Sequence, residues 1–338
     1  MNQFIERLWY ERSLWRLICL PFFLPLTFIY VLVVYCRKCY FLFFVRRQSQ
    51  CSVPVIVVGN ISVGGTGKTP LTLALIRYFH GRGYRVGVIS RGYGGKPDVY
   101  PHKVLPTDDP GTCGDEPLLI SQRTGAPVVI DPDRVAALRF VMESSECDLV
   151  ISDDGLQHLN LQRDVEIVVV DARRGLGNGW CLPAGPLREP ASRLKSVDFV
   201  IANGEGSIPA NYQMQLAPSR LVAVSGHDSR LTNDFAGKRV HGVAGIGNPE
   251  RFFLTLEALG IEVIRHAFPD HHRYTRQDID FNDGLPVIMT EKDAVKCRVF
   301  ELSDLWYLEV EGVVDQSFFE NLEACIQNKR SLPERAGR

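Results

Sequence analysis

Short apolar runs alternate with helix-like stretches over the middle of this chain. Runs rich in Val, Ile and Leu occupy residues 53–58, 85–90, 127–130, 147–152 and 165–170. Residues 71–81 and 134–143, which lie between such runs, carry apolar side chains at helical spacing. Because strands that alternate with helices form parallel sheets covered on both faces, the pattern predicts a parallel α/β core.

A second alternating series follows residues 203–220, which are polar and which we expect to form a loop at a domain boundary. Strands are predicted at residues 221–224, 240–244, 287–289 and 306–310, with a helix at 249–259. We therefore expect three parts. They are an N-terminal segment at 1–50, a larger α/β domain at 51–205, and a smaller α/β domain at 206–338.

The N-terminal segment contains residues 17–36, which carry no charged side chain and match the length of a helix that crosses a bilayer. No small-residue cleavage site follows, as a secretory signal requires. Pro21 and Pro25 are easier to place in a membrane helix than in a tightly packed core. The sequence predicts membrane attachment and leaves open whether the helix crosses the bilayer or lies in its interface.

Composition narrows the possible partners. The chain has 338 residues, 45% of them hydrophobic and 23% charged, with a net charge of −1. No overall field attracts nucleic acid, so we expect no nucleic-acid partner. The 9 cysteines are irregularly spaced, and Cys36 and Cys39 lack the second ligand pair that a zinc site needs, so reduced thiols are expected.

Residues 59–70, GNISVGGTGKTP, follow the first apolar run and predict a phosphate-binding loop between a strand and a helix. In such a loop Lys68 reaches the β- and γ-phosphates of a nucleotide, and the Thr69 hydroxyl binds Mg²⁺. Ser62 departs from the usual motif, which has glycine there. Backbone N–H groups that would cradle the phosphates belong to Gly64, Gly65, Thr66 and Gly67.

Two acidic positions suggest phosphoryl-transfer chemistry. The strand at 147–152 ends in Asp153 and Asp154, which would place a carboxylate beside the Mg²⁺ of a phosphate loop, although Asp-Gly also opens ordinary turns. Asp115 lies in a stretch, residues 97–117, that we expect to be an active-site loop. A kinase needs a carboxylate there to accept the proton of the acceptor hydroxyl.

Three further polar clusters each have two interpretations. Residues 270–274, DHHRY, contain a histidine that could pair with a carboxylate, or they form a solvated turn. Arg188 and Glu189 lie in a Pro/Gly-rich loop where a guanidinium would suit phosphate oxygens. Residues 290–293, TEKD, follow a predicted strand, at the edge where α/β sheets place ligands. The last two clusters could equally be helix caps.

Taken together, these strings resemble one family, the tetraacyldisaccharide 4′-kinases. The resemblance rests on GNISVGGTGKTP, SRGYGG, GDEP, ISDDGLQH, LPAGPLRE, FPDHHRYT and TEKDAVK, which occur in this order over residues 59–296. It implies ATP-dependent phosphorylation of the 4′-hydroxyl of a tetraacylated glucosamine disaccharide 1-phosphate, giving lipid IVA at the cytoplasmic face of the inner membrane. It also implies two α/β domains joined by linking strands, with the active site between them.

The resemblance assigns roles by motif. Lys68 and Thr69 would serve ATP and Mg²⁺, and Asp115 would be the catalytic base, paired with His271 in preference to His272, although the string offers both. Further site residues on the same grounds are Asp153, Asp154 and Gln157 for Mg²⁺ and positioning, together with Arg91, Arg188 and Glu189. The family itself carries serine at the position of Ser62. We expect no obligate protein partner.

Two other functions are compatible with parts of the pattern. A membrane-bound nucleotide switch would share the phosphate loop and the apolar segment, but it would leave Asp115 and the histidine cluster without a use. A kinase with a different glycolipid acceptor would share every motif, because apolar pockets discriminate weakly between acyl chains.

Overall fold

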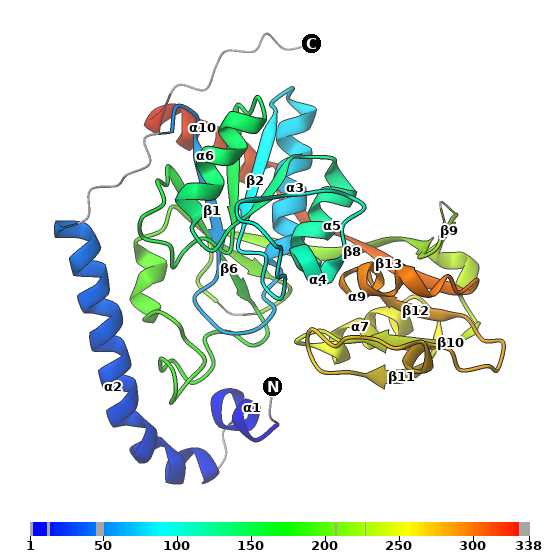
Figure 1. The fold of residues 1–338 in the computed structure, drawn as a ribbon. Coiled ribbons are helices and arrows are strands. Elements are labelled where there is room, and N and C mark those ends of the chain that lie inside the picture. The colour runs from blue at the N-terminus through cyan, green and yellow to red at the C-terminus, as the bar shows by residue number, and fades with distance from the viewer. Residues whose placement is uncertain (1–2, 12–13, 45–50, 207, 227, 331–338) are drawn as a thin grey trace.

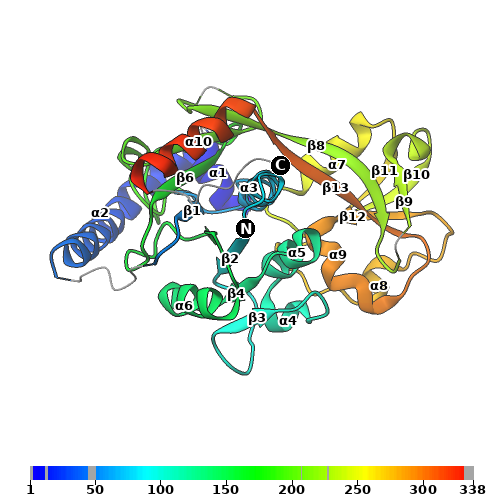
Figure 2. The ribbon, with the colours of Figure 1, turned by 90° about the horizontal axis from the view of Figure 1, so that it is seen from above.

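The chain forms two lobes joined by a long two-stranded ribbon (Figures 1 and 2). The structure, a computed structural model, describes residues 3–11, 14–44, 51–206, 208–226 and 228–330. One 13-stranded sheet runs through both lobes in the order β11-β10-β12-β13-β8-β7-β6-β1-β5-β2-β4-β3, and β9 pairs with β8. The predicted α/β class with a mostly parallel sheet is confirmed.

The large lobe contains the parallel core of the sheet. Its strands are β1 (Val55–Gly59), β2 (Val86–Ser90), β4 (Val128–Ile130), β5 (Leu149–Asp153), β6 (Val165–Asp171) and β7 (Phe199–Asn203), with the short β3 (His102–Val104) antiparallel to β4. Its helical elements are α3 (Lys68–Gly81), α4 (Pro110–Cys113), α5 (Asp115–Thr124), α6 (Arg134–Ser144), η1 (Ala191–Lys195) and the C-terminal α10 (Gln316–Lys329).

Strand β1 shows why this core is apolar. All of its residues are buried because helices cover both faces of the sheet. Ile56 and Val58 pack in the cluster that contains side chains of α3, α5 and α10, whereas Val55 and Val57 pack in the cluster that contains side chains of α6. The alternation follows from the two-residue repeat of a strand. Helix α10 therefore belongs to the large-lobe core, although the sequence-based division counted it with the smaller domain.

The small lobe is a second parallel α/β unit. Its strands are β10 (Arg239–Ala244), β11 (Glu262–Ala267) and β12 (Val287–Thr290), with β9 (Ser229–Leu231) beside the ribbon. Its helical elements are η2 (Thr232–Phe235), α7 (Pro249–Ala258), α8 (Arg276–Ile279), α9 (Glu291–Cys297) and η3 (Arg298–Phe300). Phe252, Phe253 and Leu256 on α7 are buried in its core.

The ribbon consists of β8 (Tyr212–Ala223) and β13 (Leu305–Val314), which pair antiparallel. The expectation of a loop over residues 203–220 is therefore wrong, because most of that segment is strand. A ribbon between two lobes is covered on few sides, so residues 212–220 of β8 include exposed polar side chains and lack the apolar run of a core strand. The predicted division at residue 205 falls between β7 and β8.

The N-terminal residues form α1 (Gln3–Tyr10) and α2 (Leu14–Phe43). Helix α2 stands along the large lobe on the side away from the small lobe (Figures 1 and 2). Within it, Ile18–Phe41 is long and apolar enough to cross a membrane, with a mean hydropathy of 2.3 and only 6% of its most apolar window buried.

Candidate active site

The phosphate-binding loop lies between β1 and α3, as the sequence predicts. Gly67 precedes α3 with φ 96°, a left-handed conformation that favours glycine. A Cβ atom at Gly67 would lie 2.2 Å from Nδ2 of Asn203. Asn203, at the end of β7, donates a hydrogen bond of 2.9 Å to the carbonyl of Thr66. The end of a neighbouring strand thus fixes the loop's shape.

Asp154 lies next to the loop lysine because β5 pairs with β1 in the sheet. Its Oδ1 is 3.5 Å from Nζ of Lys68, and its Oδ2 is 3.5 Å from Nη1 of Arg188. Burial alone would raise the pKa of Asp154, but the charges of Lys68 and Arg188 outweigh burial and lower that pKa. Asp154 also has φ 50°, and such strained residues cluster at functional sites.

Asp153 is the more deeply buried carboxylate, at 1% exposure. Burial, and then the neighbouring charge of Glu116, raise its pKa above the ordinary range. Its Oδ1 atom is buried and accepts no hydrogen bond from any described residue. The hydroxyl oxygen of Thr66 in the loop is also buried and has no hydrogen-bond partner among the described residues. Polar atoms buried in this way indicate missing partners, which a bound ion or phosphate can supply.

These oxygen atoms fit Mg²⁺, which prefers carboxylate and hydroxyl oxygens and keeps phosphate oxygens among its ligands. In the part of the chain that the structure describes, no group of three or more His, Cys, Asp and Glu side chains could hold a metal by itself. A magnesium ion beside the loop would therefore need phosphate oxygens of a nucleotide among its ligands, in addition to oxygen atoms of the protein.

Two other predicted residues, Gln157 and Glu189, form hydrogen bonds close to the phosphate loop. Nε2 of Gln157 donates to Oε1 of Glu189 at 2.8 Å and to the carbonyl of Asn60 at 3.2 Å. Arg134, which the sequence did not single out, is almost fully buried and donates to the carbonyl of Asp131 at 2.7 Å. Burial lowers the pKa of Arg134 to about 10.

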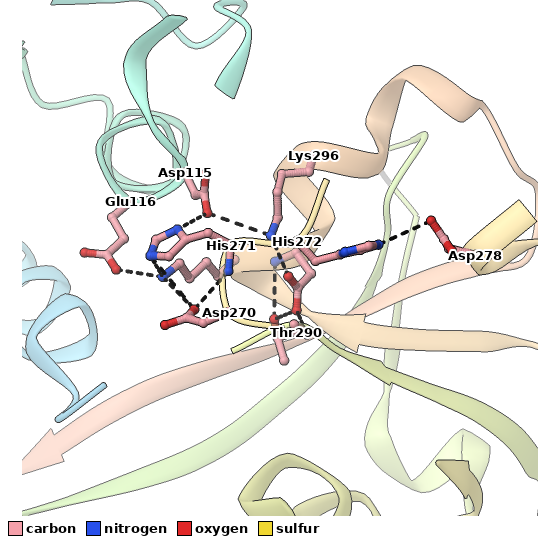
Figure 3. A network of polar contacts seen from close by, with 11 residues as sticks. Asp115, Glu116, Asp270, His271, His272, Asp278, Thr290 and Lys296 are labelled. Carbon is pink, nitrogen blue, oxygen red and sulfur yellow. Dashed lines mark hydrogen bonds and ion pairs between the residues drawn. The ribbon is translucent and has the colours of Figure 1, made fainter. Parts of the chain in front are cut away.

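Asp115 of the large lobe and His271 of the small lobe face one another (Figure 3). Nδ1 of His271 lies 3.1 Å from Oδ2 of Asp115. Asp115 is the first residue of α5, so the expectation of a continuous loop over 97–117 is wrong: β3 and α4 also lie in that stretch. Burial alone would raise the pKa of Asp115, but the His271 hydrogen bond and the charges of Lys296 and Lys292 lower it.

The structure brings His271, and not His272, to Asp115. His272 turns away, with Nε2 3.3 Å from Oδ2 of Asp278 and its ring stacked 4.7 Å from that of Phe268 (Figure 3). His271, in the loop that follows β11, has φ 60°, a left-handed backbone conformation. Neighbouring histidines therefore point in different directions.

Lys292 belongs to the 290–293 cluster that the sequence indicated, whereas Lys296 was given no role by the sequence. Lys292 on α9 pairs with Glu116 at 3.0 Å, and Lys296 lies 3.8 Å from Oδ2 of Asp115. At residues 290–293 the interpretation as a helix cap is confirmed for Thr290, and the placing of a ligand at this edge stays a prediction. Thr290 caps α9 by accepting a hydrogen bond from the backbone N–H of Asp293, whereas Lys292 reaches the cleft. The i, i+4 spacing of the two lysines was the available signal.

Two cavities meet at Glu116. One, of about 280 Å³, lies between the lobes and is lined by the phosphate loop, Asn203, Arg251 and apolar side chains of the ribbon and α7. The other, of about 300 Å³, is lined by both members of the Asp153–Asp154 pair and by His271. Of the other predicted residues, Gln157, Arg91 and Arg188 line this second cavity.

A phosphate-binding loop on a parallel α/β sheet, carboxylates beside its lysine, and an Asp–His pair opposite define a nucleotide-dependent phosphotransferase of the P-loop class. The family model of tetraacyldisaccharide-1-P 4′-kinase matches residues 19–327. The chain therefore belongs to the tetraacyldisaccharide 4′-kinase family and is a kinase.

Similar proteins agree with this assignment. The tetraacyldisaccharide 4′-kinase of Hahella chejuensis is 52% identical over 98% of this chain and 98% of its own length. That of Pseudomonas aeruginosa (strain LESB58) is 50% identical over 90% of this chain and 92% of its own. A crystal structure of LpxK from Aquifex aeolicus in complex with ATP has a TM-score of 0.74 and 25% identity, covering 90% of this chain and 98% of that one.

Proposed function

We propose that this kinase transfers the γ-phosphate of ATP to the 4′-hydroxyl of a tetraacyldisaccharide 1-phosphate, which forms lipid IVA in lipid A biosynthesis. The proposal rests on one observation: a residue of the phosphate-binding side and a residue of the Asp115–His271 pair line the same cavity. Asp154, ion-paired with Lys68, and His271, bonded to Asp115, line the same space of about 300 Å³. A phosphate donor and a hydroxyl acceptor can therefore be brought together there.

ATP fits the cavity between the lobes. Backbone N–H groups of the phosphate loop and the N-terminus of α3 suit the triphosphate. The apolar part of the cavity suits a purine ring, and its lining includes Leu73, Leu216, Phe252, Leu308 and Val310. The relative from Aquifex aeolicus was crystallised with ATP.

Proton transfer is assigned to Asp115. An ionised Asp115 accepts the proton of the acceptor hydroxyl, while His271 holds the carboxylate in place through its Nδ1 atom. Lys68 and Arg188, which both pair with Asp154, stabilise the charge of the transferring phosphoryl group. Mg²⁺, held by Thr69, Asp153 and Asp154, would neutralise phosphate charge when bound.

The apolar helix suggests how the enzyme reaches a lipid acceptor. One face of α2 packs on the large lobe: Tyr30 donates to the carbonyl of Arg188 at 2.9 Å, and the backbone N–H of Ala184 donates to the Thr27 hydroxyl at 3.0 Å. Elsewhere on the helix, Phe22 and Phe28 are exposed. A helix packed along the catalytic lobe favours embedding beside that lobe at the membrane surface over a separate crossing helix.

The inner membrane, at its cytoplasmic face, is the location that this arrangement fits, because the acceptor is acylated and ATP is cytoplasmic. Binding to the same surface as the acceptor raises the effective concentration of the two reactants. No obligate protein partner enters this scheme.

The test uses full-length protein in mixed micelles with γ-labelled ATP, Mg²⁺ and the tetraacyldisaccharide 1-phosphate. We expect label in a chloroform-soluble product whose mass rises by one phosphate. Release of inorganic phosphate alone would favour the nucleotide switch and contradict the proposal. Mass spectrometry of the lipid that accumulates on depletion of the protein in cells identifies the acceptor: a different glycolipid would replace the one proposed here.

A further inference from the structure

Helix α9 of the small lobe directs two lysines at two adjacent carboxylates on α5 of the large lobe. Nζ of Lys292 lies 3.0 Å from Oε1 of Glu116, and Nζ of Lys296 lies 3.8 Å from Oδ2 of Asp115. The lysines are four residues apart, so they share one face of the helix. The polar network in Figure 3 is therefore made of groups from both lobes.

Lys292 also contacts the far side of the His271 ring. Its Nζ atom lies 3.5 Å from Nε2 of His271, whose Nδ1 faces Asp115. An ammonium group can only donate hydrogen bonds, so the ring nitrogen that it contacts must accept. In a neutral ring the single proton then resides on Nδ1, where it is donated to the Asp115 carboxylate.

The alternative proton positions are less favourable in this geometry. With the proton on Nε2, two donors would face one another at Lys292, and two acceptors would face one another at Asp115. The Asp270 carboxylate favours the other tautomer, with the proton on Nε2 of His271, because its Oδ1 lies 3.9 Å from that nitrogen. However, Lys292 is nearer to that nitrogen and also pairs with Asp270 at 3.6 Å, which offsets the aspartate's charge.

Lys292 is well suited to this contact because it is mostly buried and stays charged. Its side chain is 19% exposed. Burial alone would lower the pKa of Lys292, but the charges of Glu116 and Asp270 outweigh burial and raise it. The ammonium donor is therefore present whenever the lobes are in this arrangement.

We propose that Lys292 is a positioning residue of the kinase reaction, which holds His271 in the tautomer that donates to Asp115. This role rests on the proposed function of the Asp115–His271 pair. Lys292 and His271 both belong to the small lobe, whereas Asp115 belongs to α5 of the large lobe, so the donating Nδ1 atom meets its carboxylate only where the two lobes are together. Wrong tautomers are costly in enzymes that depend on a histidine–carboxylate pair.

The direct test is ¹⁵N NMR of the histidine rings in the full-length protein in micelles, with the His271 signals assigned by their loss in His271→Gln. We expect the Nδ1–H tautomer in the wild type and in Lys292→Arg, whose guanidinium also only donates. In Lys292→Met we expect a mixture of tautomers or the Nε2–H form. An unchanged tautomer in Lys292→Met, or an Nε2–H ring in the wild type, would overturn the proposal.

Kinetics supply the second readout. We expect Lys292→Met to lower kcat by about 10–100-fold, the usual effect of losing a group that orients a reacting residue, and to change KM for ATP by much less. Lys292→Arg should recover part of that loss. Equal losses in both variants would contradict the role, because the arginine keeps the donor.

The matched control is Arg123→Met, which removes another ion pair between α5 and α9. Nη1 of Arg123 lies 2.8 Å from Oε1 of Glu291, and neither residue contacts His271. We expect this variant to keep the His271 tautomer. If Arg123→Met shifts the tautomer as Lys292→Met does, the effect belongs to lobe packing in general and the specific role of Lys292 is wrong. The NMR readout needs no substrate, so a failure of lipid phosphorylation would count against the proposed function alone.

Discussion

At the scale of single residues, the site contains a buried carboxylate whose charge is stabilised by hydrogen bonding and by neighbouring positive charges. Asp115 is mostly buried, yet its pKa is lowered, because the His271 hydrogen bond and two lysines outweigh the cost of burial. A carboxylate with a lowered pKa stabilises the fold above its ordinary pKa, and this contribution is lost as pH falls through the lowered value. The same shift keeps the proposed base ionised throughout the neutral range.

Replacement of Asp115 by Asn should therefore separate chemistry from binding. The amide keeps the shape of the carboxylate but cannot accept a proton, so we expect Asp115→Asn to lower kcat by about 10²–10⁴-fold. ATP affinity should stay near that of the wild type, because Asp115 does not line the cavity at the phosphate loop. Steady-state kinetics and calorimetry with Mg·ATP measure the two effects. An enzyme with full turnover would exclude Asp115 as the base.

Which of these residues could be read from the sequence depended on how local their signal is. Lys68 and Asp154 each lie within a short motif at the end of an apolar strand, so their position in the fold follows from local pattern. Lys292 and Glu116 pair over 176 positions of sequence, and neither residue type is unusual for a helix surface. Their pairing is decided by how α9 packs on α5, which no local pattern contains.

At the scale of elements, the pattern of apolar residues predicts strands that are buried on both faces of the sheet, and it fails for strands that are only partly buried. Strands β1, β2 and β5 are fully buried, and their valine and isoleucine runs gave their positions to within two residues. Residues 212–220 of β8 are mostly exposed or half-buried and carry no apolar run, so the pattern predicts a loop there, whereas the apolar end of the strand at 221–223 is predicted correctly. Helix α2 was predicted from its length and apolar character, but its packing against the large lobe required the structure.

The two faces of α2 lead to a prediction about membrane binding. Phe22 and Phe28 are 78% and 71% exposed, whereas Thr27 and Tyr30 pack on the lobe. We expect the double substitution Phe22→Glu/Phe28→Glu to reduce binding to phospholipid vesicles at least tenfold, because two apolar anchors become charges, each costly to bury in lipid. Vesicle flotation measures the binding, and calorimetry checks that ATP affinity is kept.

Val299→Glu provides the matched control, since Val299 is 73% exposed on the small lobe, far from α2 in the fold. This variant should float with vesicles like the wild type. Equal flotation of the double variant and the wild type would mean that α2 is not the membrane anchor.

At the scale of the whole molecule, the nucleotide cavity belongs to neither lobe alone. The phosphate loop and Asn203 come from the large lobe, whereas Arg251 on α7 comes from the small one. Nη2 of Arg251 donates to Oδ1 of Asn203 at 3.1 Å, and the same asparagine holds the loop through Thr66. The position of the small lobe is thus linked to the shape of the loop through a single side chain.

This link predicts that Arg251→Met weakens ATP binding without unfolding the protein. ATP at 100 times its Kd stabilises a protein by about 2.7 kcal/mol. If the variant raises Kd about tenfold, the same ATP concentration gives only about 1.4 kcal/mol, and the ATP-induced rise in Tm falls in proportion. Arg239→Met, which removes a solvent-exposed pair with Glu262 elsewhere in the small lobe, should keep the full rise. An undiminished rise in Arg251→Met would show that the large lobe binds the nucleotide alone, and the small lobe would then serve only to bring His271 and α9 to the acceptor.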